Sequence, residues 1–107
     1  MQLNQIKQQF TQVERVIEQA TQAIQTDNLA SPELKDTVRQ LGTKFSETKQ
    51  LLQKSQDEAG ILRSIDDLEE TGDRAKKAVE SGNVSSQMKN AILQVHEHIS
   101  TLKKQAH

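Results

Sequence analysis

Apolar residues recur along the chain at alternating spacings of three and four, which is the pattern of a helix that packs one stripe against its neighbours. Four stretches show it. Their stripe positions are Leu3, Ile6, Phe10, Val13, Ile17, Ala20 and Ile24; Leu34, Val38, Leu41, Phe45, Thr48 and Leu52; Ile61, Ile65, Leu68, Gly72, Ala75 and Val79; and Met88, Ile92, Val95, Ile99 and Leu102. Val16 and Ala23 widen the first stripe on one side. The spacing therefore predicts four amphipathic helices.

Helix-terminus signals separate these stretches. Ser31 precedes Pro32, the order expected of an N-cap and a first helical residue. Ser85 or Ser86 would cap the fourth helix, and Gly82 would end the third helix in the left-handed conformation.

The joint between the second and third helices, residues 54–60, is ambiguous. Gly60 is the only helix breaker there, and capping boxes can be drawn either at Ser55 with Glu58 or at Ser64 with Asp67. A turn would give a closed bundle, which we favour. A helix that continued through the joint would merge the second and third helices into one rod, as in an intertwined dimer.

The expected fold is therefore an all-α, antiparallel four-helix bundle forming a single domain over residues 1–107. Its two halves also align. The loop Asn28-Leu29-Ala30-Ser31 matches Asn83-Val84-Ser85-Ser86, and the flanking stripes match as well. This predicts two repeats of one αα-hairpin, over about 2–54 and about 57–105, although any two hairpins with heptad patterns align fairly well.

Composition excludes several classes of protein. The chain has no cysteine and two aromatic residues, and only 33 % of it is hydrophobic, so disulfide scaffolds and most β-folds are ruled out. Its 14 basic and 15 acidic residues leave no positive surplus for nucleic acid or anionic membranes. Neither a signal peptide nor a membrane span is apparent, which predicts a cytoplasmic protein.

Side chains suited to catalysis or metal binding are scattered. His96 and His98 are two residues apart on a helix, so they point in different directions and cannot share a metal. Asp66, Glu69, Glu70 and Asp73 are stacked on one helix but lack a calcium-loop pattern, which is typical of a solvated face. We therefore expect no enzyme activity, no cofactor, no metal and no small-molecule substrate.

Two glycines occupy helical positions. Gly72 stands in the third stripe, where a large apolar residue is expected, and antiparallel pairing would place it near Gly42. Two glycines at one level would let the second and third helices approach closely.

The first helix is rich in glutamine and poor in charge. Amides can be half-buried without the desolvation cost of ions, so this face suits contact with another protein, although compositional bias would give the same pattern. The interface residues we predict are Gln5, Gln9, Gln12, Val16, Gln19 and Ala23.

The expected function is that of a non-enzymatic interaction module that forms a homodimer or binds another helical protein. The chain resembles small all-α bacterial proteins in general. It is similar to the phasins only in its Gln- and Ala-rich amphipathic helices with few aromatics. That likeness implies an alternative function, the coating of a hydrophobic granule or lipid surface.

Overall fold

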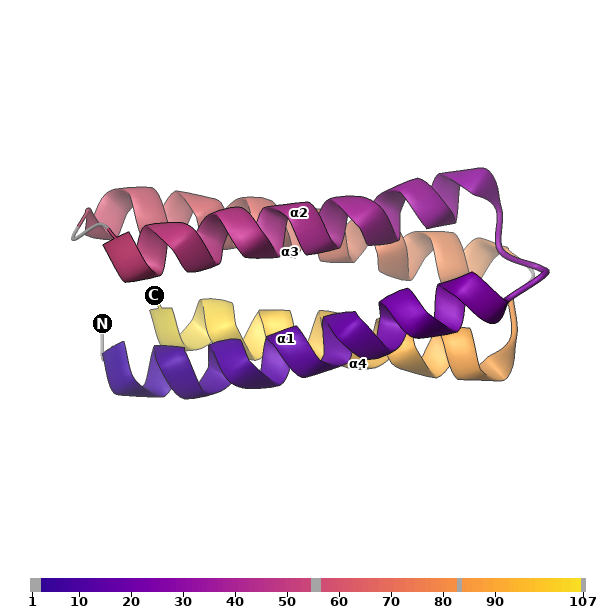
Figure 1. Cartoon of the computed structure of the whole chain (residues 1–107), viewed down its shortest axis with the longest axis horizontal. Helices are drawn as coiled ribbons and strands as arrows, with labels where there is room; N and C mark the ends of the chain where they lie inside the picture. The colour runs from indigo at the N-terminus through magenta and orange to yellow at the C-terminus, as the bar shows by residue number, and fades with distance from the viewer. Residues whose placement is uncertain (1–2, 55–56, 83, 107) are drawn as a thin grey trace.

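A computed structural model describes residues 3–54, 57–82 and 84–106, and these form an antiparallel four-helix bundle (Figure 1). The helices are α1 (Leu3–Thr26), α2 (Pro32–Lys54), α3 (Glu58–Ser81) and α4 (Ser86–Ala106), and the described residues contain no strand. The bundle measures 42 × 20 × 19 Å. Around it, α1 lies beside α2 and α4, and α3 lies beside the same two helices. The predicted fold class is confirmed.

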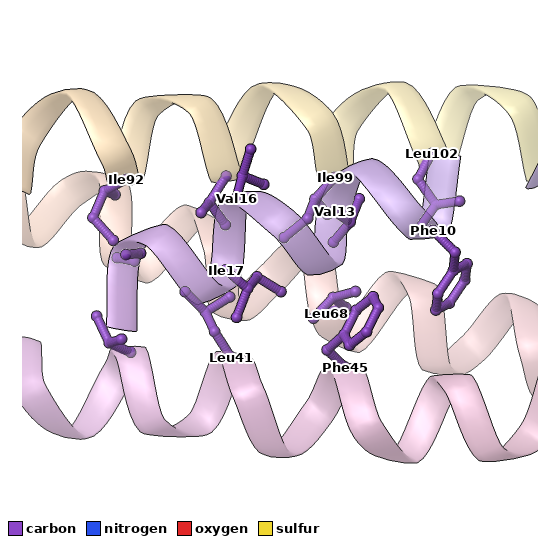
Figure 2. Packing of buried hydrophobic residues seen from close by; sticks show 14 of the residues in the cluster. Phe10, Val13, Val16, Ile17, Leu41, Phe45, Leu68, Ile92, Ile99 and Leu102 are labelled. Carbon is purple, nitrogen blue, oxygen red and sulfur yellow. The ribbon is translucent and has the colours of Figure 1, made fainter. Parts of the chain in front are cut away.

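The core consists of the four predicted stripes. From Ile6 to Ile24 every stripe position of α1 is buried, and so are all the stripe positions of α3 and α4. Figure 2 shows part of this core. Leu52, at the end of the α2 stripe, is only half-buried. The buried threonines Thr37, Thr48 and Thr71 each donate a hydrogen bond to the carbonyl four residues earlier, so their hydroxyls are satisfied inside the bundle.

The helix starts follow the serine signals. Ser31 Oγ accepts a hydrogen bond from the Leu34 N–H at 3.1 Å, and Pro32 is the first residue of α2. Ser85, rather than Ser86, caps α4, because its Oγ accepts from the Met88 N–H at 3.1 Å. The capping box at Ser64 is wrong, since Ser64 lies inside α3 and its hydroxyl is 2.5 Å from Thr48 Oγ1. The alternative box at Ser55 lies outside the described residues.

The expected left-handed conformation of Gly82 is also wrong. Gly82 has φ −116° and ψ 171°, an extended backbone that any residue adopts. The reason lies in where the chain goes next. Only a short connection links α3 to the cap at Ser85, and an extended residue covers that distance where a left-handed turn would curl back on the helix.

The second and third helices are separate and run antiparallel (Figure 1). α2 ends at Lys54 and α3 begins at Glu58, preceded by Asp57 in an extended conformation. The chain therefore turns at this joint, and the continuous-rod alternative is not the arrangement found. That the two hairpins are repeats of one unit stays a prediction.

The two loops at the opposite end of the bundle are joined through Asp27. Its carboxylate accepts hydrogen bonds from the Leu29 N–H at 2.8 Å, the Ser85 N–H at 3.1 Å and the Ser85 hydroxyl at 3.0 Å. These N–H donors, Leu29 first and Ser85 next, lower the pKa of Asp27 below its ordinary value of 3.8. One aspartate thus holds the α1–α2 loop against the N-terminus of α4.

The expected close approach of two glycines is not found. A Cβ atom at Gly42 would meet no heavy atom within 4 Å, so no neighbouring helix closes on this position. Gly72 is buried, and a Cβ there would lie 3.4 Å from Ile99 Cδ1 of α4. Gly72 therefore makes room for a large side chain of α4, and it does not pair with a glycine of α2.

Candidate interaction surface

The six predicted interface residues divide into two groups. Gln5, Gln12 and Gln19 are exposed, and Gln9 is half-buried. Val16 and Ala23, in contrast, are only 5 % and 6 % exposed and belong to the core. Figure 2 shows Val16 on the side of α1 that faces α4. The widened edge of the α1 stripe is thus largely covered by α4 of the same chain, so these two residues offer little surface to a partner.

The glutamines that remain exposed border a longer surface shared by α1 and α4. Two hollows of about 550 Å³ and 700 Å³ lie along it. The first is lined by Gln5, Gln8, Gln9, Thr11, Gln12 and Gln105, and the second by Gln19, Gln22, Ala23, Thr26, Gln87, Asn90, Ala91 and Gln94. Among the residues that the structure describes, no charged side chain lines either hollow. We call these lining residues the amide face.

The contribution of α4 to the amide face was missed in the sequence. A signal for it exists, because uncharged residues follow one another at spacings of four and three along α4. They are Gln87, Ala91, Gln94, His98, Thr101 and Gln105. The pattern does not identify a surface by itself, because it runs beside the apolar stripe with the same period. Only the packing of α4 against α1 places these residues along the amide face.

A pair of side-chain contacts joins the two halves of the amide face. The Gln9 side-chain amide lies 3.1 Å from His98 Nδ1 and donates a hydrogen bond to the His98 carbonyl at 3.2 Å. The contact between α1 and α4 therefore joins a side-chain amide to an imidazole and a backbone carbonyl.

Among the described residues, charged side chains join the other helix pairs. Lys49 on α2 contacts Glu14 on α1 at 2.9 Å, and Lys103 on α4 contacts Glu69 on α3 at 2.8 Å. The hydrogen bond to Glu69 is the largest cause that raises the pKa of Lys103. Arg74 on α3 donates to the side-chain carbonyl of Gln40 on α2 at 3.0 Å. The α1–α4 pair differs in being joined through amides and an imidazole.

His96, also singled out in the sequence, has a structural partner. His96 Nε2 lies 2.6 Å from Asp73 Oδ1, so this histidine joins α4 to α3. Within residues 3–54, 57–82 and 84–106, no three histidine, cysteine or carboxylate side chains gather where they could hold a metal. No helix in that part of the chain is long and apolar enough to cross a membrane.

Comparisons with models of protein families, with curated proteins and with solved structures find no match for this chain. The function is therefore inferred from the chemistry of its own surfaces.

Proposed function

We propose that this chain is a non-enzymatic interaction module that pairs with a second copy of itself through the amide face. The observation that supports the proposal is the composition of that face. Two helices that are far apart in sequence line the two hollows between them, and the described lining residues are all uncharged and mostly amides.

An amide face is complementary to itself. Each glutamine or asparagine side chain carries both donors and an acceptor, so it can bond to the same residue type on a partner. A symmetric dimer places one surface patch against its own copy, and a charged patch would then meet like charge. Neutral amides avoid this repulsion, and removing water from an amide costs less free energy than removing water from an ion.

The size of the bundle fits a dimer interface. One whole long side of the bundle, of which the amide face is a part, measures 42 by 20 Å, close to the roughly 800 Å² that stable interfaces bury on each partner. Apolar coating of a granule has less support. Among the described residues, Leu29 is the only large hydrophobic side chain that is strongly exposed.

Sedimentation equilibrium over a micromolar concentration range tests the proposal. We expect a concentration-dependent dimer for the unmodified chain. Gln12→Lys places a positive charge in the first hollow, and Gln94→Lys places one in the second. In a symmetric dimer of either variant, both copies would bring that charge into the same interface. Both variants should shift the equilibrium to monomer. Gln50→Lys is the matched control, because Gln50 is exposed on α2, away from the amide face.

Two results would overturn the proposal. A chain that is monomeric at every micromolar concentration would refute self-association. A dimer that the Gln12→Lys and Gln94→Lys variants weaken no more than Gln50→Lys does would place the interface elsewhere. Far-UV circular dichroism must show that all three variants keep the helical content of the unmodified chain.

A further inference from the structure

Both aromatic residues of the chain line one cleft between α1 and α2. The cleft has a volume of about 420 Å³, and it is lined by Lys7, Phe10, Thr11 and Glu14 from α1 and by Phe45, Lys49, Leu52 and Gln53 from α2. This volume is within the range of small-molecule sites in proteins. The cleft uses a different pair of helices from the amide face.

The inner wall of the cleft is apolar. The rings of Phe10 and Phe45 lie side by side with their centroids 5.0 Å apart and an angle of 40° between their planes (Figure 2). Both belong to the buried core, and Leu52, which is half-buried, extends the apolar wall toward the end of α2. Only a small part of each phenylalanine, 5 % of the residue, is exposed at the base of the cleft, beside Leu52.

The rim of the cleft is cationic. Lys49 and Glu14 form an ion pair at 2.9 Å and neutralise each other, which leaves the exposed Lys7 as a net positive charge. A second hollow along the same pair of helices is lined by Lys35 and Arg39, but Arg39 forms an ion pair with Asp36 at 3.4 Å. The positive charge at the cleft therefore comes from Lys7, in a chain whose net charge is −1.

From this geometry we infer that the cleft binds a single-chain amphiphile with an anionic head group, of the chemical class of a fatty acid. The hydrocarbon tail lies against Phe10, Phe45 and Leu52, where its burial provides most of the affinity. The carboxylate lies at the rim, beside the ammonium group of Lys7 and within reach of Lys49. An uncharged or cationic amphiphile would bury its tail in the same way but would lack the attraction to the Lys7 ammonium group.

The chain provides its own reporter for this test. It contains no tryptophan or tyrosine, so the ring signals of Phe10 and Phe45 are the only phenyl resonances in a proton NMR spectrum. Dodecanoate, titrated below its micelle-forming concentration, should shift both ring signals in a saturable way. Intermolecular NOEs should connect its methylene protons to the rings. Dodecyltrimethylammonium has the same tail with the opposite charge, and it should bind roughly fivefold more weakly, as expected for one exposed charge contact.

Variants at the rim test the role of charge without disturbing the core. Lys7→Gln should weaken dodecanoate binding about two- to fivefold, and Lys7→Glu should weaken it further and reverse the preference toward the cationic amphiphile. Lys77→Gln is the control, because Lys77 is exposed on α3. Far-UV circular dichroism must show unchanged helicity throughout the titration.

Three outcomes would overturn the inference: ring signals that do not respond to dodecanoate, equal affinity for the two amphiphiles, and a Lys7→Glu variant whose preference is unchanged. Each is measured apart from self-association, because the amide face lies between α1 and α4 and shares only Thr11 with the cleft.

Discussion

Replacing Gly42 by alanine adds one methyl group at a helical position where the structure leaves open space. No heavy atom lies within 4 Å of the new Cβ, so the substitution neither clashes nor gains a contact. What remains is helix propensity, which favours alanine over glycine by about 0.8–1 kcal/mol because glycine loses more backbone entropy. We therefore expect Gly42→Ala to stabilise the bundle by about 1 kcal/mol.

Two other glycines provide matched comparisons for the same chemical change. At Gly72 the new methyl group would lie 3.4 Å from Ile99 Cδ1, so the propensity gain is offset in part by a small displacement of Ile99. At Gly82 the residue is extended rather than helical, and its Cβ would lie 3.0 Å from the Ala78 carbonyl oxygen. The expected order of stability is Gly42→Ala first, Gly72→Ala second, and Gly82→Ala at or below the unmodified chain.

Thermal and urea unfolding, followed by circular dichroism at one fixed protein concentration, measure this order. For a domain of this size, a gain of about 1 kcal/mol raises the unfolding midpoint by roughly 4 °C. With a urea m-value of about 1.5 kcal/mol/M, it raises the urea midpoint by roughly 0.7 M. If Gly42→Ala instead lowers the midpoint, another backbone must approach Gly42 closely. The open space beside Gly42 described above would then be incorrect.

Three further predictions concern the loops and the core. Asp27→Asn should destabilise the bundle at pH 7 and much less at pH 3. Because the pKa of Asp27 is lower in the folded chain, its carboxylate stabilises the fold above pH 3.8, the pKa in the unfolded chain. This stabilisation is lost as the pH falls through the pKa of the folded chain. Urea midpoints measured between pH 7 and pH 3 would disprove this if the two proteins stayed equally far apart. Glu58→Pro should leave the thermal midpoint nearly unchanged, because Glu58 is the first residue of α3 and proline is tolerated there. A decrease of about 3 kcal/mol in the free energy of unfolding would instead indicate a continuous helix through the joint. Ile92→Ala should cost about 2–5 kcal/mol in urea unfolding because Ile92 is fully buried, and a loss below about 1 kcal/mol would mean that α4 is loosely packed.

The helices and their buried stripes could be predicted from the sequence, because burial along one helix directly imposes the spacing of three and four. The N-cap at Ser31 could be predicted for a similar reason, since a serine hydroxyl and the Leu34 N–H that it binds are three residues apart. These features depend on local geometry, which a single sequence contains.

Features that depend on which helix lies beside which could not be predicted. Val16 and Ala23 read as a free edge of α1 until α4 is placed on them. The cleft at Phe10 and Phe45 likewise requires α1 and α2 to lie side by side. The conformation of Gly82 depends on the direction of the chain beyond it, and no local preference reports that direction.

The link between Asp27 and Ser85 has a consequence for the order of folding. The two residues are 58 positions apart, yet Ser85 is also the residue that caps α4. Asp27 can reach it only after the first hairpin has docked against the second, so the start of α4 is completed by a residue from the other half of the chain. A peptide containing only α3 and α4 would keep the Ser85 cap but lack the carboxylate that holds Ser85 in place, so the N-terminus of α4 should fray more readily. Adding a peptide of α1, α2 and their loop should supply that carboxylate, so that hydrogen exchange at the Met88 amide would time the docking of the two halves.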